Sequence, residues 1–442
     1  MGSEGTLIKL GDLVAHKKGF AFKSVDYQST GIPVVRVSNF TDNGISPDDL
    51  KFVSEEVASK NSDVALTEND IVVATVGSWP TNPASVVGRT ISVPAWASGA
   101  LMNQNSVTLR ARSKNQVDQR FLYFCMKSAD FATHVVSKAQ GSANQASITL
   151  DAIFSFPVWW PDSAVRQDIV AVLDSLDSRI NLLRETNATL EAIAQALFKS
   201  WFVDFDPVRA KMEGRLPEGM DETTAALFPD GLEESELGTV PIGWAVGVLG
   251  DILKLRNERV QPSENTALLP YVPIENINAK FPFLQEFKSG QDANSSLTLF
   301  YKGDVLFGAM RPYFHKVCSA PFDGVTRTTV FTLTPMNPNV GVFALFQAYQ
   351  DSTIQYATQH SEGSTIPYAK WRNSMELMPL FIPAEPIQMA FSSVVSSFVE
   401  CANSNILQAQ NLAALRDTLL PRLISGQLRL TEVEARIDAI SA

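Results

Sequence analysis

The sequence has few of the residues that build metal centres and disulfide frameworks. Its 442 residues include three cysteines, Cys125, Cys318 and Cys401, which lie far apart, and four scattered histidines. Three distant cysteines match neither a zinc-finger spacing nor a complete set of disulfide partners. We therefore predict a protein without a metal site that resides in a reducing compartment, the cytoplasm.

The sequence also lacks the patterns of membrane proteins and of nucleotide-dependent enzymes. No apolar run approaches the roughly 20 residues of a membrane-spanning helix, so no membrane association is predicted. There is neither a glycine-rich phosphate loop followed by lysine nor a dinucleotide-binding fingerprint. No set of catalytic side chains stands out. We expect a protein that is not an enzyme by itself and binds no cofactor of its own.

Acidic residues are concentrated in one segment. The formal net charge is −11, and residues 211–237 hold eight acidic and two basic side chains, which supply −6 of it. A negative net charge ordinarily argues against nucleic-acid binding. Because one segment carries much of that charge, a local basic face elsewhere is neither excluded nor shown.

Two long stretches have the periodicity of a helix with one apolar seam. Apolar residues recur every three or four positions from Asp162 to Asp206, and the pattern returns 222 residues later. Pro207 is expected to end the first helix, because proline cannot continue it. The first seam contains Val165, Ile169, Val172, Leu176, Ile180, Leu183, Asn187, Leu190, Ala194, Leu197 and Trp201, and the second contains Ile387, Phe391, Val394, Phe398, Ala402, Asn405, Ala409, Leu412, Arg416, Leu419 and Leu423. Two helices with matching seams are expected to pair within the chain.

The segments before the two helices repeat as well. Leu-Gly-Asp-Ile at 249–252 corresponds to Leu-Gly-Asp-Leu at 10–13, and the Gly-Ser pair at 363–364 corresponds to the one at 141–142. Short β-branched runs alternate with helical spacing in both segments, which indicates an α+β fold in one unit used twice. The predicted organisation is a first globular domain at 1–161, a central long helix at 162–209, an acidic linker at 210–240, a second globular domain at 241–384, and a C-terminal long helix and tail at 385–442.

Polar clusters in both globular domains have the chemistry of DNA recognition. The side-chain amide of asparagine or glutamine can form two hydrogen bonds with one adenine, and arginine and lysine can bind guanine or phosphate. The alternative is that these are ordinary residues of solvated loops. The candidates are Arg36, Arg89, Asn103, Gln104, Asn105, Lys138, Gln140, Gly141, Ser142, Asn144 and Gln145 in the first domain, and Arg311, Tyr313, His315, Lys316, Arg327, Thr328, Gly363, Ser364, Thr365, Tyr368, Lys370 and Arg372 in the second.

Four motifs in this order resemble a known family over essentially the whole chain. They are Leu-Phe-Lys-Ser-Trp-Phe-Val-Asp-Phe at 197–205, the acidic connector at 216–230, the restart at 235–244, and Leu-Leu-Pro-Arg-Leu-Ile-Ser-Gly at 419–426. With these motifs the chain is similar to the specificity subunits of type I restriction–modification systems.

The resemblance implies two target-recognition domains with pseudo-two-fold symmetry, each of which recognises one half of a bipartite site in double-stranded DNA. It implies that the two helices form an antiparallel coiled coil that sets the spacer between the half-sites. Two methyltransferase subunits would dock on this scaffold, and restriction subunits would join them in defence against foreign DNA. S-adenosylmethionine is expected on the methyltransferase partner, which methylates adenine, and not on this chain.

Aromatic and aliphatic residues crowd the ends of the two predicted helices. Phe198, Phe202 and Phe205 at the first, with Leu420 and Ile424 at the second, are candidates for docking another subunit. Two alternatives to the family assignment stay open from the residues alone. One is the specificity subunit of a type II-like combined restriction–methylation enzyme, and the other is a coiled-coil scaffold that binds only proteins.

Overall fold

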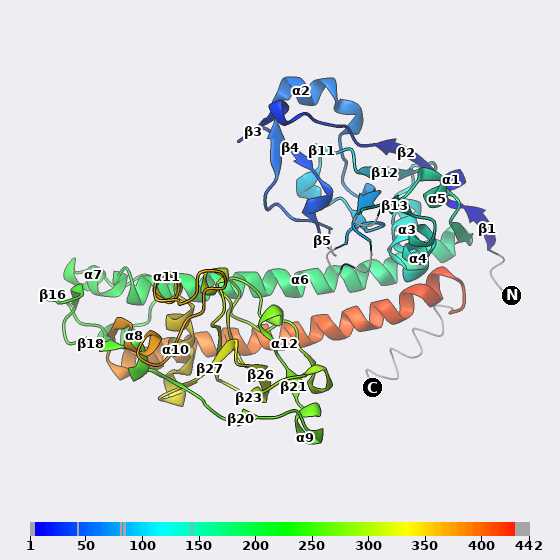
Figure 1. Ribbon diagram of the computed structural model, residues 1–442. Helices are drawn as coiled ribbons and strands as arrows, with labels where there is room; N and C mark the ends of the chain where they lie inside the picture. Colours follow the sequence, from blue (N-terminus) through cyan, green and yellow to red (C-terminus); the bar gives the residue numbers. More distant parts are fainter. Residues whose placement is uncertain (1–4, 42–43, 80–81, 83–84, 143–144, 429–442) are drawn as a thin grey trace. The chain divides into compact units, whose positions relative to one another are not determined.

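The chain forms two compact units, each built around part of two long helices (Figure 1). A computed structural model describes residues 5–41, 44–79, 82, 85–142 and 145–428. Unit 1 comprises residues 1–179 and 411–442, and unit 2 comprises residues 180–410. The long helices are α6 (Ser163–Phe202) and α12 (Glu385–Ile424), so each unit contains one part of both. This agrees with the expected α+β fold with paired long helices.

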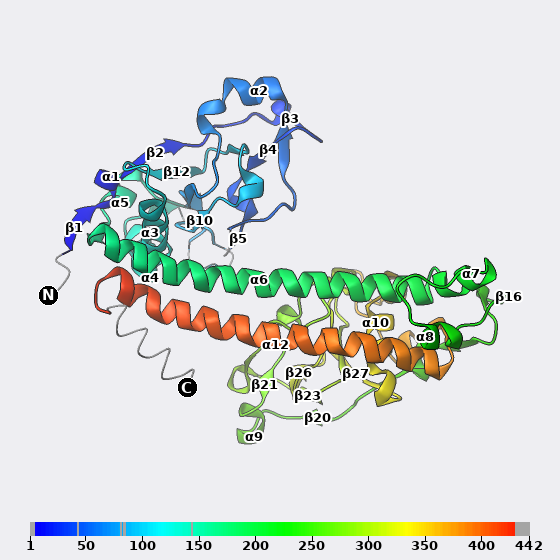
Figure 2. The same ribbon diagram turned by 180° about the vertical axis from the view of Figure 1, so that it is seen from behind.

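Within each unit the two helices pack in opposite directions (Figures 1 and 2). In unit 1 the Arg416 guanidinium donates to the Asp177 carboxylate at 2.7 Å. In unit 2 the buried amide of Asn187 donates to the carbonyl of Ala402 at 3.1 Å and accepts from the Asn405 amide at 2.9 Å. A buried polar pair of this kind fixes the register between two helices because other registers leave its amides without partners.

The predicted seams describe these helices with one local difference. All residues of the first seam are buried or half-buried. In the second seam, Val394 is instead 45% exposed, and its neighbour Val395 is fully buried. The two valines are adjacent, so the apolar pattern alone could not tell which of them faces the partner helix.

The end of the first helix differs from the prediction at Pro207. Helix α6 ends at Phe202, and Pro207 lies in the first turn of a new helix, α7 (Asp206–Met212). Phe205 between them is left-handed, with φ of 58°. Proline suits the first turn of a helix because its fixed φ is helical and its missing N–H would have no partner there. The proline therefore begins α7 and is not what stops α6.

The acidic segment is an ordered part of unit 2. It continues through α8 (Glu222–Leu227) into a hairpin of β16 (Leu232–Ser235) and β17 (Gly238–Pro241). Phe228 is 2% exposed and its ring lies edge-on to Trp201, with centroids 5.2 Å apart. The acidic side chains thus lie on a segment that is anchored to the hydrophobic core.

The globular parts of the two units share a sheet order. In unit 1 a four-stranded antiparallel sheet runs β10 (Thr90–Ser92), β8 (Ile71–Ala74), β12 (Ser106–Ala111), β2 (Val14–Lys18). In unit 2 the corresponding order is β25 (Val317–Ser319), β24 (Val305–Gly308), β27 (Val330–Pro335), β19 (Leu253–Leu255). The same four positions in the chain order supply the same four places in each sheet, as expected for an internal repeat.

Smaller sheets and helix pairs repeat in the same way. In unit 1, β4 (Ile32–Val35) lies between parallel β11 (Leu101–Met102) and antiparallel β7 (Lys51–Val53), followed by β3 (Tyr27–Gln28). In unit 2, β21 (Pro270–Tyr271) lies between parallel β26 (Gly324–Arg327) and antiparallel β22 (Lys288–Ser289), and β23 (Leu297–Phe300) and β20 (Arg259–Val260) extend this sheet. The helix pair α3 (Gln116–Lys127) and α4 (Ala129–Ser137) corresponds to α10 (Gly341–Tyr349) and α11 (Asp351–Gln359).

A strand pair joins each globular part to its long helices. In unit 1, β1 (Thr6–Lys9) pairs with β15 (Pro157–Trp160), which leads directly into α6. In unit 2, β18 (Ala245–Val248) pairs with β28 (Pro379–Ile382), which leads into α12. The remaining short elements of unit 1 are α1 (Leu10–Leu13), β5 (Phe40–Thr41), β6 (Gly44–Ile45), α2 (Glu55–Lys60) and α5 (Leu150–Phe154), and unit 2 adds α9 (Glu264–Ala267).

A buried aspartate repeats at the start of the second strand of each main sheet. Asp70 accepts the backbone N–H of Thr67 at 2.8 Å, and Asp304 accepts that of Tyr301 at 2.9 Å. Each aspartate also binds an arginine side chain, but the arginines come from different strands. Arg110 lies on β12, whereas Arg256 directly follows β19, on the other side of β27. The two units therefore share the aspartate and its turn, but the arginine that balances the aspartate's charge comes from a different strand in each unit.

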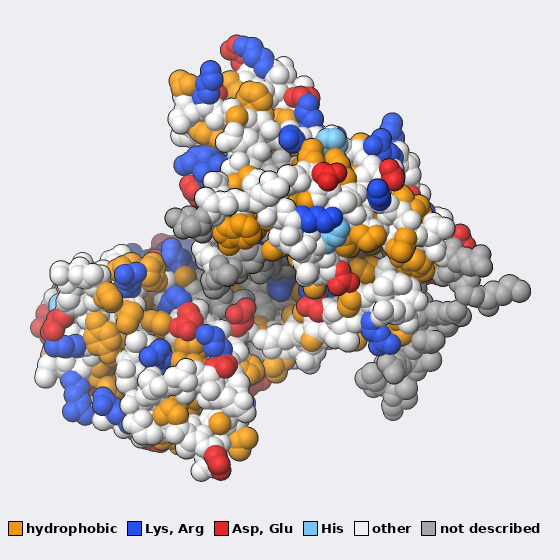
Figure 3. All heavy atoms as spheres, turned by 45° about the vertical axis from the view of Figure 1, so that its right-hand side comes forward, with side chains coloured by type: hydrophobic (Ala, Val, Ile, Leu, Met, Phe, Trp, Pro, Cys, Tyr) orange, Lys and Arg blue, Asp and Glu red, His pale blue; other side chains and the backbone are white. Residues whose placement is uncertain are grey.

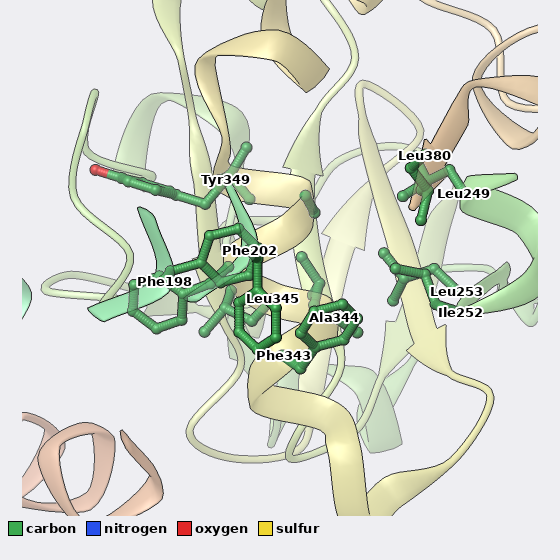
Figure 4. Close-up of a cluster of buried hydrophobic side chains, with 14 of the residues drawn as sticks. Phe198, Phe202, Leu249, Ile252, Leu253, Phe343, Ala344, Leu345, Tyr349 and Leu380 are labelled. Atoms are coloured by element: carbon green, nitrogen blue, oxygen red, sulfur yellow. The ribbon is translucent and has the colours of Figure 1, made fainter. Parts of the chain in front are cut away.

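The core of unit 2 is formed where the end of α6 meets the globular part (Figure 4). Phe202 packs against Phe343 of α10, with ring centroids 5.0 Å apart, and Phe198 packs against Phe391 of α12 at 5.6 Å. These rings are edge-on, which is the favourable arrangement of aromatic quadrupoles. None of the helices in the described part of the chain is both long and apolar enough to cross a membrane.

Candidate nucleic-acid interface

In unit 1 a three-stranded sheet holds most of the predicted polar loop at the surface. The strands β13 (Gln140–Ser142) and β14 (Gln145–Ser147) pair with each other, and β14 also pairs with β9 (Val76–Gly77). Gln140, Gly141, Ser142 and Gln145 are all exposed there. Asn144 lies outside the described residues.

The predicted amides at 103–105 lie beside this sheet. The carbonyl of Asn105 accepts the N–H of Thr75 at 2.9 Å, and the carbonyl of Thr75 accepts the N–H of Ile148 at 2.8 Å. The backbone of Thr75 thus connects the 103–105 turn to the end of β14. Gln104 is exposed, whereas Asn103 is half-buried, with its amide within 3.3 Å of the Tyr27 hydroxyl.

A polar hollow of about 340 Å³ opens at this junction. Gln104 lines it together with residues that the sequence did not single out, namely Lys18, Thr75, Ser147 and Thr149. Lys18 follows Lys17 and precedes a glycine at the end of β2, and this pair of lysines was the available sequence signal. Ser147 and Thr149 offered none, because a lone hydroxyl does not stand out in a polar loop.

Two predicted cations of unit 1, Arg36 and Arg89, bind groups of their own unit. The Arg36 guanidinium donates to the Asp49 carbonyl at 2.7 Å and carboxylate at 3.0 Å, and together with Lys51 it lowers the pKa of the Asp49 carboxyl. Arg89 donates to the carbonyl of Phe40 at 3.1 Å. Both guanidinium groups therefore bind nearby parts of the unit.

The third cation, Lys138, lies at the end of α4. Its ammonium donates to the Ser155 hydroxyl at 2.7 Å and lies 3.2 Å from the His134 imidazole. Burial, followed by the Lys138 charge, lowers the pKa of His134. Lys138 is exposed, so its charge is also available to solvent.

In unit 2 the equivalent three-stranded arrangement brings two predicted clusters together. Tyr368 forms antiparallel bridges with Glu362 on one side and with Met310 on the other, as β14 does with β13 and β9. The N–H of Arg311 donates to the carbonyl of Pro367 at 2.7 Å. The turn that begins at Arg311 is therefore attached to the polar loop.

The polar loop of unit 2 is exposed. Gly363, Ser364 and Thr365 are all accessible, and Gly363 has a left-handed φ of 92°, which a side chain would strain. The Tyr368 hydroxyl donates to the carbonyl of Thr328 at 3.2 Å, which places the exposed Arg327–Thr328 turn nearby. Lys370 pairs with Glu362 at 2.6 Å, and Arg372 is exposed.

Two predicted DNA contacts of unit 2 have buried or half-buried side chains. The His315 imidazole lies 2.8 Å from the Tyr349 carbonyl, 3.4 Å from the Asp351 carboxylate and is 7% exposed. Burial lowers the pKa of His315. The Lys316 ammonium donates to the Ile274 carbonyl at 2.8 Å, and burial lowers its pKa as well. Both side chains hold the turn in place, and a direct DNA contact by either stays a prediction.

All five docking candidates are buried within their own unit. Phe198, Phe202 and Phe205 are 1%, 8% and 7% exposed in unit 2, and Leu420 and Ile424 are 6% and 8% exposed in unit 1. These side chains build the cores that position the helix ends. Their predicted role in docking another subunit is not tested by this burial, but a partner would meet the surface around them first.

A separate hollow in unit 2 is apolar. It measures about 450 Å³ and lies between α12 and the segments that precede β22 and follow β23 and β25, with Phe287, Phe322 and Leu407 in its wall. An apolar wall suits neither phosphate nor base edges. Among the residues that the structure describes, no group of three or more histidine, cysteine or acidic side chains could hold a metal ion.

Comparison with known proteins gives consistent matches. The family model described as the type I restriction modification DNA specificity domain matches residues 3–192. The specificity subunit of the type I restriction enzyme HindI from Haemophilus influenzae is 26% identical over 359 residues, which cover 71% of this chain and 78% of that protein. The MjaIX specificity subunit from Methanocaldococcus jannaschii is 25% identical over 338 residues, which cover 72% and 71%.

A solved structure has the same fold. The crystal structure of the S subunit of a type I restriction–modification system from M. genitalium superposes with a TM-score of 0.55 and 15% identity, covering 96% of both chains.

Proposed function

We propose that this chain, which belongs to the type I restriction–modification DNA specificity family, recognises a bipartite DNA site with one half-site bound by each of its two units. As a specificity subunit it is the DNA target-recognition component of such a complex and is not the catalytic subunit.

The observation that carries the proposal is the repeated polar surface. The strand pair β13–β14 of unit 1 and the loop at 362–368 of unit 2 occupy equivalent places, because β14 pairs with β9, which follows β8, and Tyr368 bridges Met310, which follows β24. Both are exposed, yet their residues differ: amides and serine in unit 1, and hydroxyls with nearby arginines in unit 2. A common frame with different exposed side chains is what two different half-sites require, because base edges are distinguished by their donors and acceptors.

We infer that the partners are two methyltransferase subunits, joined by restriction subunits in the full complex. S-adenosylmethionine would be bound by the methyltransferase, which methylates adenine within the site. The exposed faces of α6 and α12, which the buried helix ends hold in place, are the proposed docking surface. We also infer that the paired helices set the spacer, because the length of the helices limits the distance between the two half-sites that the globular parts can bind.

A domain exchange combined with methylation mapping tests this division of labour. The chain is co-expressed with its methyltransferase, and methylated adenines are mapped across the host genome. Residues 10–156 are then replaced by those of another family member, which retains β1 and β15. This boundary keeps Trp159 beside Gly426, where a side chain at 426 would come within 2.7 Å of the indole, and keeps Arg166 stacked on Trp160 at 4.1 Å.

The expected result is a two-part motif of which the exchange alters one half and preserves the other half and the spacer. A motif that changes in both halves, or no methylation by the wild-type complex, would contradict the proposal. Copurification with a single polypeptide that both cleaves and methylates would indicate a type II-like enzyme.

A further inference from the structure

The turn between β24 and β25 of unit 2 presents two aromatic rings to solvent. It covers residues 311–316 and contains a short 3₁₀ helix at Pro312–Phe314. The Tyr313 and Phe314 side chains are 47% and 46% exposed, and their ring centroids lie 4.9 Å apart. Exposing two neighbouring aromatic rings to water is unfavourable, and burying them against a partner would recover that free energy.

This turn is held in a strained and well-anchored conformation. Arg311 and His315, on either side of the 3₁₀ helix, are both left-handed, with φ of 50° and 51°. Such angles are unfavourable for residues with side chains, and they persist only where the surroundings enforce them. Here the Arg311 N–H donates to Pro367 at 2.7 Å, and the His315 carbonyl accepts the Lys280 N–H at 2.8 Å.

Side chains add to this anchoring. His315 is held against the Tyr349 carbonyl and Lys316 against the Ile274 carbonyl, both at 2.8 Å. The two exposed rings therefore project from a rigid base. A rigid base lowers the entropy lost when the rings bind, which is the usual benefit of preorganisation.

Unit 1 carries an aromatic residue at the equivalent place. Tyr313 lies five residues beyond the last residue of β24, Gly308, and Trp79 lies five residues beyond the last residue of β8, Ala74. Trp79 is half-buried, and its indole N–H donates to the Ser142 carbonyl of the polar hairpin at 2.7 Å. In unit 1 the indole itself bonds to the loop proposed to recognise bases, whereas in unit 2 the turn that carries Tyr313 is attached to that loop through the Arg311 N–H.

The surroundings of the unit 2 turn favour a polyanionic partner. Arg311 lies at its base, Lys280 is bonded to it, and the exposed Arg327 lies on the neighbouring β26. Carboxylates also lie near the turn: Asp351 is 3.4 Å from the His315 imidazole, and Glu275 acts on the Lys316 ammonium. On the face of unit 2 drawn in Figure 3, lysine and arginine side chains lie among apolar ones, and acidic side chains lie there as well.

We propose that the Tyr313–Phe314 turn is a wedge that stacks against a base step of the half-site bound by unit 2 and partly unstacks it, with Trp79 in the same position in unit 1. Apolar side chains that enter between base pairs kink the duplex and so make recognition depend on how easily that step deforms. This inference rests on the proposed function, and it adds an indirect contribution to the recognition of base edges by the polar loops.

The test uses the complex of the full chain with its methyltransferase, after the wild-type motif has been mapped. Duplexes carry 2-aminopurine at successive positions in the half-site assigned to unit 2, since this base becomes fluorescent when it is unstacked. The variants are Tyr313→Ala, Phe314→Ala and their combination. Tyr313→Phe retains the ring, and Met336→Ala is a matched control because Met336 is also exposed, at 53%, and follows β27 outside the turn.

The wild-type complex is expected to raise the fluorescence at one step, and the double variant to abolish that rise. Loss of the rings should weaken DNA binding by about fivefold to 100-fold, the range found for base–aromatic stacking. Met336→Ala should behave as the wild type, and Tyr313→Phe, which keeps the ring, should retain the rise in fluorescence. Fluorescence and affinity within twofold of the wild type in the double variant would overturn the wedge, as would loss of methyltransferase binding, which would assign the rings to a protein interface. Absence of any bipartite motif would instead count against the proposed function.

Discussion

Removing one heptad from each long helix should shorten the spacer of the recognised site by about three base pairs. Seven residues at about 1.5 Å per residue correspond to roughly 10 Å. That is close to three steps of about 3.4 Å in duplex DNA. A shorter scaffold therefore predicts a shorter spacer, if the helices set it.

The structure indicates which residues can be removed. The pair Asp177–Arg416 in unit 1 and the pair Asn187–Asn405 in unit 2 mark the register on either side of the units' boundary. Deleting residues 178–184 and 408–414 leaves both pairs intact and preserves the heptad pattern. One bond that is lost is that from the Gln410 amide to the Gln285 carbonyl, at 2.5 Å.

Removal of a heptad also turns one unit relative to the other by about 20°, because an α-helix drifts by that amount per seven residues. Some loss of activity is therefore expected together with the shorter spacer. The measurement is genome-wide mapping of methylated adenines. The control replaces the exposed residues of the same two segments without changing their length, and its spacer should stay as in the wild type.

An unchanged spacer in an active deletion variant would refute the reasoning. A deletion in only one helix keeps the apolar seam but shifts it by one heptad, so that the Asp177–Arg416 and Asn187–Asn405 pairs cannot both form, and methylation should be abolished.

The remaining predictions concern stability, pH and affinity. Asp118→Ala should destabilise unit 1 by about 3–5 kcal/mol in urea unfolding, because it leaves the buried Arg166 guanidinium, now bonded at 2.9 Å, without its counter-ion; a loss below about 1 kcal/mol would contradict this. Asn187→Ala should cost about 1–3 kcal/mol, the sum of one buried and one partly buried hydrogen bond, whereas an equally stable variant would show that the pair does not fix the register. His315 has a lowered pKa in the folded state, so the unfolded chain binds a proton more readily. The stability of unit 2 should thus decline as pH falls below about 6.5, the ordinary histidine value, and His315→Gln should reduce that decline; identical pH profiles would exclude His315 as its source. The acidic connector leads us to expect weak binding of duplex DNA by the isolated chain at physiological salt, and tight binding in a titration would show that the methyltransferase is not needed for affinity.

The helices and the repeat were predictable because both follow from the spacing of residues along the chain: apolar residues recur every three or four positions, and similar motifs return in both halves. The seam positions of α6 are all buried or half-buried, and the Gly-Ser loops at 141–142 and 363–364 do occupy equivalent places. The sequence could not show that Val395 is buried and Val394 exposed, since two adjacent valines fit the apolar pattern equally well. Pro207 was misjudged because proline is disfavoured inside a helix yet favoured in its first turn.

The candidate interface was predictable only in part. Polar loops can be found from composition, but whether a cation is available depends on partners far along the chain. Arg89 binds the carbonyl of Phe40, and His315 binds that of Tyr349, and neither partner has a signal in the sequence. Likewise an aromatic-rich helix end has the same pattern whether it packs on its own unit, as Phe198 and Phe202 do, or on another protein.

The composition of unit 1 from two distant parts of the chain has a consequence for synthesis. Its core contains Leu419, Leu423 and Leu428, which pack with Ile169 and Leu173 of α6. Unit 2 is formed by the continuous residues 180–410. On the ribosome, where residues emerge in order at about 5–20 per second, unit 2 can therefore complete its core first, and the first globular part must wait for the last helix. A chain released before residue 411 would expose the apolar residues of α6 that the last helix normally covers. Premature termination should therefore yield a product that aggregates, and not a protein that still recognises one half-site.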